Sequence, residues 1–96
     1  MKTSEKIHDT SKEFIYALKF SKEDVIDSKT EKRQRSFQLI RAMRLGNLFK
    51  NKVTILFKDA HDRIMKINTT IWGVTQQSVI LKKGVLIPIT SIISVE

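Results

Sequence analysis

The fold of this chain is decided by residues 52–96, which read KVTILFKDAHDRIMKINTTIWGVTQQSVILKKGVLIPITSIISVE. At the start of this stretch Val53, Ile55 and Phe57 occupy alternate positions, and a period of two predicts a strand with one strongly apolar face. The segment 64–75 is rich in β-branched residues, which favours a second strand after a hairpin turn. This half of the chain is therefore expected to be a β-sheet.

Short turns divide the rest of the stretch. Gly73, inside the second strand, indicates a bulge or a sharp bend. Pro88 has no backbone N–H, so it marks an edge strand or the end of its strand. We expect an antiparallel meander of four or five strands, with turns at 59–63, 76–78, 83–84 and 90–91 and further strands at 79–82, 85–89 and 92–95.

A basic helix is expected before the meander, at about 29–45. It would begin near Ser28 or Thr30, and no residue inside it breaks a helix. Arg44 gives a basic last turn, and Gly46 suits the left-handed position that follows a helix. The apolar side of this helix is predicted to comprise Leu39, Ile40, Ala42 and Met43.

The N-terminal segment carries signals for shorter helices. A capping-box pattern that begins at Thr10 favours a short helix through about Phe20. The apolar run at 14–18 is also compatible with a strand, because a short run does not settle the period. A second N-cap pattern at 21–24 predicts one or two more helical turns, and residues 1–10 are expected to be frayed.

Together these elements predict an α+β protein of one domain, because 96 residues rarely support two cores. Residues 1–51 would form a helical N-terminal segment and residues 52–96 the meander. The bent second strand and the ending at 87–95, in which a tight turn separates two short strands, resemble SH3-like and Sm-like small β-barrels of the Rho-binding antiterminator type. That resemblance implies a small β-barrel that touches nucleic acid or its protein machinery. It leaves open whether the barrel closes, and it carries over no individual binding residue. The segment 41–47 with the meander also resembles small bacterial proteins without an assigned function.

The charge of the chain is concentrated in one quarter of it. The formal net charge is +8. Residues 29–52 alone hold eight Lys or Arg and one acidic residue, a net charge of +7. A basic block of this kind favours an anionic partner, most often nucleic acid. The alternative interpretation is a solvated helix face that binds nothing.

An arginine stripe is predicted on the basic helix. On a wheel of about 100° per residue, Arg33, Arg41 and Arg44 fall within about 40° of Phe37, whereas Arg35 lies off the stripe. Guanidinium groups suit phosphate oxygens, and an exposed phenylalanine would stack on a base. In the alternative, Phe37 lies at the margin of the core and the arginine stems extend past it. The predicted nucleic-acid-binding residues are Arg33, Phe37, Arg41, Arg44, Lys50 and Lys52.

Trp72 is the single tryptophan of the chain. Burial in the core is its expected position, because a small domain needs the volume of its large side chains. If Trp72 were exposed, it would instead be an anchor for a partner.

The chain lacks the residue sets of common catalytic and metal sites. It has no cysteine, and its two histidines, His8 and His61, are too few for the His–Asp metal sites that each His-Asp pair suggests. It also has no Gly-rich phosphate loop and no Gly-x-Ser-x-Gly elbow. We expect no enzyme activity, no cofactor and no metal. The lack of cysteine and of a long apolar run favours a cytoplasmic protein without a membrane partner.

The sequence therefore predicts a non-catalytic binding module that contacts RNA or DNA through the basic helix. The alternative is a protein-interaction or self-assembly domain. In that case the meander would expose a strand edge near Pro88 to a partner protein or to a second copy of the chain, giving a homo-oligomer.

Overall fold

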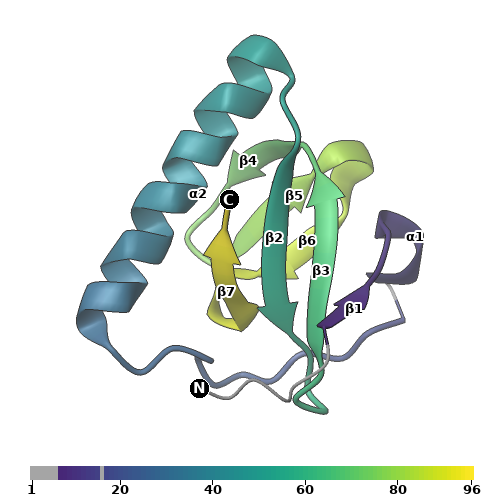
Figure 1. Ribbon diagram of the computed structural model, residues 1–96, viewed down its shortest axis with the longest axis vertical. Coiled ribbons are helices and arrows are strands. Elements are labelled where there is room, and N and C mark those ends of the chain that lie inside the picture. The colour runs from purple at the N-terminus through teal and green to yellow at the C-terminus, as the bar shows by residue number, and fades with distance from the viewer. Residues whose placement is uncertain (1–6, 16) are drawn as a thin grey trace.

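The computed structural model describes residues 7–15 and 17–96, and it has the expected α+β class (Figure 1). One long helix, α2, lies along the side of two small sheets. In chain order the elements are β1 (Ile7–Asp9), α1 (Lys12–Ile15), α2 (Lys29–Phe49), β2 (Val53–Lys58), β3 (Ile64–Thr69), β4 (Ile71–Val74), β5 (Ser78–Leu81), the 3₁₀ turn η1 (Lys82–Gly84), β6 (Leu86–Pro88), the 3₁₀ turn η2 (Ile89–Ser91) and β7 (Ile92–Val95). Within the described residues, no helix has the length and apolarity needed to cross a membrane.

The strands form two sheets with the orders β1-β3-β2-β7 and β4-β5-β6. The predicted second strand is broken at Thr70, where the chain leaves β3 and continues as β4 in the other sheet. The strands therefore do not form the expected small barrel, and the question of closure that the sequence leaves open is answered by two open sheets. β6 pairs with β5 and β7 pairs with β2, so the ladder is not closed between the two consecutive strands that η2 connects.

The strand β2 lies inside the first sheet and follows the predicted alternation. Val53, Ile55 and Phe57 are buried, while the residues between them are only half-buried. β2 pairs with β3 on one side and with β7 on the other, both antiparallel. Because both edges of β2 are occupied and one face is covered, its apolar side chains form the centre of the core. The other core residues come from both sheets and from α2, and the most deeply buried are Leu39, Ile67, Ile71, Val79, Leu81, Ile87 and Ile92.

The turn predicted at 59–63 connects β2 and β3, and Asp59 organises it. Its buried carboxylate accepts hydrogen bonds from the backbone N–H of His61 at 3.0 Å, the backbone N–H of Arg63 at 2.9 Å and the Arg63 Nε at 2.7 Å. Burial alone would raise the pKa of Asp59, but the hydrogen bonds from Arg63 and His61 outweigh it and lower the pKa. The carboxylate therefore stays charged and holds the turn closed.

The helix α2 begins where the sequence predicts and ends later. Ser28 is the N-cap, and its hydroxyl oxygen accepts from the Glu31 N–H at 3.3 Å. The predicted end at Leu45 is wrong, because the helix continues to Phe49 and Lys50 takes the left-handed conformation, with φ 55°. Gly46 has a different purpose: a Cβ atom there would collide with the carbonyl oxygen of Ile71 in β4. The glycine lets the helix end lie directly on the second sheet.

The inner face of α2 carries one buried charge. Arg35 is 5% exposed, and its guanidinium donates to the two carboxylate oxygens of Asp24 at 2.9 and 2.8 Å and to the Ile92 carbonyl at 2.9 Å. The pKa of Asp24, which burial would raise, is lowered overall by these bonds and by the N–H of Ile26. This ion pair ties the segment before α2 to the helix and to the last strand.

The N-terminal segment differs most from expectation. The predicted helix through Phe20 is only the single turn α1, and residues 21–24 are not helical. There the Ser21 hydroxyl and the Asp24 carboxylate accept from N–H groups two residues ahead, which competes with a helix. The prediction of a frayed segment at 1–10 is wrong for β1, which pairs in parallel with β3, while residues 1–6 lie outside the described residues.

Candidate nucleic-acid interface

The outer face of α2 carries the predicted arginine stripe. The buried residues Arg35, Leu39, Ala42 and Gly46 define the inner face. Arg33, Phe37, Arg41 and Arg44 lie on the opposite side and are exposed, as the helical wheel predicts. Phe37 is 67% exposed, so the alternative in which it lies at the margin of the core is not realised.

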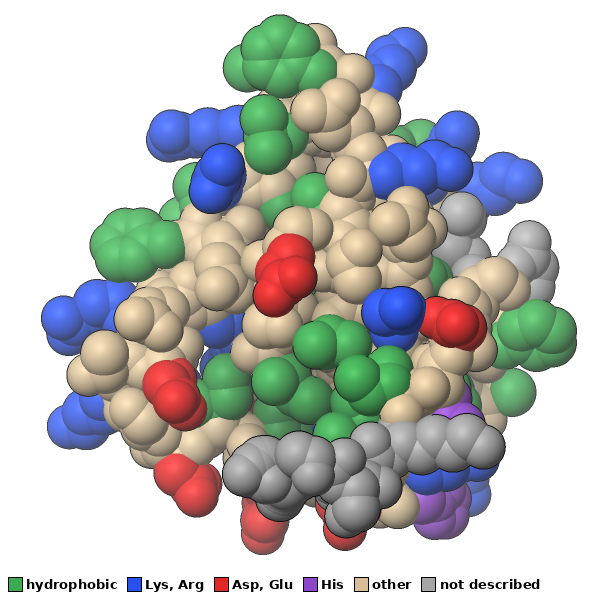
Figure 2. Space-filling model, in the orientation of Figure 1, with side chains coloured by type: hydrophobic (Ala, Val, Ile, Leu, Met, Phe, Trp, Pro, Cys, Tyr) green, Lys and Arg blue, Asp and Glu red, His purple; other side chains and the backbone are tan. Residues whose placement is uncertain are grey.

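The same outer face also carries apolar side chains that were expected elsewhere. Ile40, predicted to be buried, is 42% exposed, and Leu48 is 73% exposed. Figure 2 shows blue Lys and Arg side chains alternating with green hydrophobic ones along the edge of the molecule that α2 forms. The helix is therefore apolar on two sides: one side packs on the sheets, and the other presents apolar groups between arginines.

Lys50 and Lys52 are not part of the stripe. They lie at the C-terminal end of α2 and line a surface hollow of about 550 Å³, called the Trp72 hollow below. Its walls come from α2, the connection to β2, the start of β4 and η1. The described residues that line it are Gly46, Asn47, Lys50, Lys52, Thr70, Trp72 and Lys82. Three of these are lysines and none is acidic, so the hollow is a site of positive potential.

Trp72 lines this hollow from β4, at the position of a β-bulge. Ile71 pairs with Leu81 and Gly73 pairs with Ile80, so the register shifts by one residue and Trp72 has no partner in the ladder. Ile71 is fully buried, whereas Trp72 is 51% exposed. The expectation that Trp72 is buried is wrong, while the bulge expected at Gly73 is confirmed. Because Trp72 follows the buried Ile71 along β4, strand alternation places the single tryptophan of the chain on the outer face.

Backbone contacts fix the positions from which two of the three lysines, Lys50 and Lys82, extend. The N–H of Lys50 donates to the Gly46 carbonyl at 2.9 Å, and the N–H of Lys82 donates to the Thr70 carbonyl at 3.1 Å. The close approach of Gly46 to Ile71 brings the end of α2 against β4. The main chain around the hollow is therefore held by the fold, and the flexible lysine side chains supply the charge.

Sequence reasoning placed Lys50 and Lys52 at a binding surface but missed Asn47, Trp72 and Lys82. A signal for two of them was present. Trp72 alternates with the apolar Ile71 along the predicted strand, so burial of Ile71 places Trp72 on the opposite face. Lys82 ends the predicted strand at 79–82, directly before the predicted turn at 83–84, and a lysine beside a turn is usually exposed. No local pattern indicates that this turn lies beside the end of α2.

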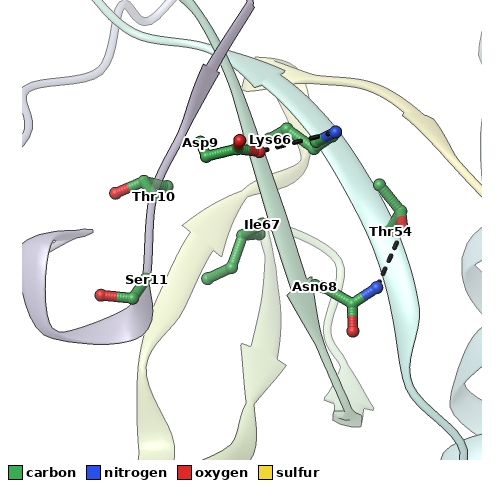
Figure 3. Close-up of a pocket in the computed structure, with 7 residues that line it drawn as sticks. All are labelled: Asp9, Thr10, Ser11, Thr54, Lys66, Ile67 and Asn68. Carbon is green, nitrogen blue, oxygen red and sulfur yellow. Dashed lines mark hydrogen bonds and ion pairs between the residues drawn. The ribbon is translucent and has the colours of Figure 1, made fainter.

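A second cavity, of about 370 Å³, lies over the first sheet beside β1 (Figure 3). Four of its polar side chains contact one another in two pairs. The Lys66 Nζ lies 3.5 Å from a carboxylate oxygen of Asp9, and the Asn68 amide donates to the Thr54 hydroxyl at 3.1 Å. Since its one lysine faces an aspartate, this cavity lacks the uncompensated charge of the Trp72 hollow. Its remaining lining residues are Thr10, Ser11 and Ile67.

The two histidines do not form part of a ligand cluster in the described residues. His8 and His61 are both exposed. Among residues 7–15 and 17–96, no three His, Cys, Asp or Glu side chains come close enough together to hold a metal ion. Asp62, which follows His61, adopts a left-handed backbone conformation with φ 62° and belongs to the hairpin turn.

No protein-family model, curated protein or solved structure matches the chain. The fold itself defines a small α+β domain. It has two open sheets, in which every pair of strands except β1 and β3 is antiparallel, and the long helix α2 flanks them.

Proposed function

We propose that this protein is a non-catalytic module that binds nucleic acid through the C-terminal end of α2 and the adjoining Trp72 hollow. The observation that carries the proposal is the composition of that hollow. Three lysines and an exposed tryptophan share one concave surface, and none of the described residues that line it is acidic. Cationic side chains around an aromatic platform are the combination used by proteins that hold a nucleic-acid backbone and its bases.

The arginine stripe extends this surface along the helix. Asn47 lines the hollow and lies one helical turn after Arg44, so the stripe ends where the hollow begins. Arg33 and Arg41 continue it toward the N-terminus of α2 over exposed positions. A backbone that enters the hollow therefore has further phosphate partners along the helix.

The resemblance of residues 52–96 to SH3-like and Sm-like domains remains part of the proposal. The bend at Thr70 between β3 and β4, and the 3₁₀ turn η2 before the last strand, support it. In this proposal the protein is an open relative of those barrels, with two sheets that do not close.

Fluorescence anisotropy with labelled single-stranded RNA, single-stranded DNA and duplex DNA tests the function. We expect binding at low salt that weakens steeply as salt rises, because phosphate contacts release counterions. The variant Lys50→Gln/Lys52→Gln/Lys82→Gln should lower the affinity at least about tenfold and reduce the slope of log affinity against log salt by about 2 for a single strand.

The matched control is Lys19→Gln/Lys22→Gln/Lys66→Gln, which removes the same charge from exposed lysines outside the hollow. Its affinity should stay within about threefold of the parent, since only the general field of the protein changes. Absence of binding to all three probes at low salt would overturn the proposed function.

A protein-interaction domain is the second candidate, and the apolar residues on the outer side of α2 favour it. Phe37, Leu48 and Phe49 are each more than 60% exposed, with Ile40 nearby on the helix. The edge strand β6, which ends at Pro88, offers a second surface for association. Light scattering over a range of protein concentrations distinguishes the self-association form of this candidate. A strict monomer at high concentration contradicts it.

A further inference from the structure

Resting on the proposed function, we propose that the Trp72 hollow holds one unpaired nucleobase of a single strand, stacked on the indole ring, with the adjoining phosphates on Lys50, Lys52 and Lys82. The site would therefore prefer single-stranded nucleic acid to duplex. This preference does not follow from the positive charge, which attracts phosphates of both.

The tryptophan is the reason to expect a base. An indole ring offers one of the best π-faces for stacking, and Trp72 is 51% exposed within a concave surface. In a small domain whose core needs large side chains, an exposed tryptophan beside a bulge is not explained by core packing. The hollow is large enough to enclose a planar ring, since its volume is within the usual range of ligand pockets.

The arrangement of the lysines favours a flexible strand. Lys50 caps α2, Lys52 lies in the connection to β2, and Lys82 begins η1, so the charges come from three elements around the ring. A single strand can bend to place successive phosphates on such a group while one base points inward. In a duplex both faces of each base are covered by its neighbours, so stacking on Trp72 would require a base to leave the helix.

Asn47 supplies a polar group on the rim of the same hollow. Its amide has both donors and an acceptor, which is what a base edge requires. The Watson–Crick edge of a stacked base is accessible only when the base is unpaired. The combination of ring, amide and three ammonium groups matches the parts of one nucleotide: a base face, a base edge and phosphate.

The intrinsic fluorescence of the protein tests this proposal, because Trp72 is the only tryptophan. Excitation where the single tyrosine does not absorb reports on the hollow alone. The probes are a short single strand, an abasic strand of equal length, a hairpin duplex and a free mononucleotide. We expect the single strand to quench Trp72 strongly, and the abasic strand and the duplex to bind through charge without quenching.

Substitution of the ring gives an independent readout. Trp72→Ala should weaken single-strand binding about 10- to 100-fold in anisotropy and leave duplex and abasic-strand binding within about twofold, because this variant lacks only the stacking surface. Trp72→Phe should recover most of the affinity. Since Trp72 is exposed, both variants should keep the parent circular dichroism spectrum and melting temperature, which are measured alongside.

The outcomes separate the two proposals. If no strand binds at low salt, the proposed function itself fails. If strands bind but Trp72 is not quenched and Trp72→Ala binds them equally, the charged surface binds nucleic acid and the base site is wrong. If the mononucleotide binds as tightly as the strand, the hollow is a site for free nucleotides and the proposal of a strand site is overturned.

Discussion

The inner and outer faces of α2 both carry arginine, but the two faces use it differently. Arg35 on the inner face is buried, with its charge opposed by Asp24 and its remaining contact made to the last strand. Arg33, Arg41 and Arg44 on the outer face are exposed. Arg33 and Arg35 are two residues apart, which places them about 200° apart around the helix. The net charge of residues 29–52 counts Arg35, although a partner cannot contact a buried guanidinium, so that number is larger than the charge available for binding.

The largest loss of stability is expected from the substitution of Arg35. Arg35→Ala leaves Asp24 without its partner in a partly buried site, which should lower the free energy of unfolding by about 3–5 kcal/mol. For a domain of this size that is close to loss of the fold. Urea denaturation measures the change. Arg33→Ala, on the outer face, should stay within about 0.5 kcal/mol, and equal losses in the two variants would break the comparison.

The next effect concerns how the helix end reaches the hollow. Gly46→Ala places a Cβ against the Ile71 carbonyl, so the end of α2 must move away from β4. We expect a loss of about 1–3 kcal/mol in urea denaturation, together with weaker binding of single strands. The matched control is Gly73→Ala, whose Cβ would meet only ordinary contacts with Ile80. If Gly46→Ala matched this control in both measurements, the close approach would not matter.

Acid should lower the free energy of unfolding by protonating Asp24, beside Arg35 on the inner face of α2, and Asp59, in the β2–β3 turn. The arginines of the outer face stay charged. The pKa values of Asp24 and Asp59 are both lowered in the folded protein, Asp24 beside Arg35 and Asp59 beside Arg63. A depressed pKa adds stability that is complete above the unfolded value of about 3.9 and is lost as the pH falls through the folded value. We therefore expect the urea midpoint to fall as the pH is lowered from about 5 to 2.

Neutral variants identify the groups responsible for that acid branch. Asp24→Asn and Asp59→Asn should be less stable than the parent near neutral pH and should lose less on acidification, because each removes one titrating carboxylate. A parent protein whose urea midpoint does not change in acid would contradict the assignment of these two carboxylates.

The smallest effect on stability, and a clear effect on binding, is expected on the outer face. Arg33→Gln/Arg41→Gln/Arg44→Gln should keep the free energy of unfolding within about 0.5 kcal/mol per substitution. The slope of the salt dependence of single-strand binding should fall by about 0.7 for each phosphate that an arginine no longer neutralises. Anisotropy over a range of salt measures it, with the triple lysine variant at positions 19, 22 and 66 as the control of equal charge. An unchanged slope would mean that the stripe is a solvated face.

Part of the candidate site was open to prediction. The arginine stripe follows from helical spacing alone, since residues 33, 37, 41 and 44 share one side of any regular helix. Which side faces water was settled by packing. Leu39 and Ala42 are buried as expected, but Ile40 is not, because the contact of α2 with β4 and β7 is centred on the line from Arg35 to Gly46.

The Trp72 hollow could not be predicted from the sequence. Asn47 and Lys50 come from the end of α2, while Trp72 and Lys82 come from β4 and η1. These pairs are brought together by Gly46 against Ile71 and by the hydrogen bond from Lys82 to Thr70. Both contacts join residues that are distant along the chain, and no local pattern encodes them.

Elements of local structure that depend only on neighbouring residues were predictable from the sequence. The alternation that makes β2, the Ser28 cap, the Asp59 turn and the bulge beside Gly73 each rest on a few adjacent positions, whose backbone preferences and hydrogen bonds are local. The burial of Arg35, in contrast, depends on tertiary contacts. Its partners are 11 and 57 residues away, and a buried charge is stable only where the fold brings such partners to it.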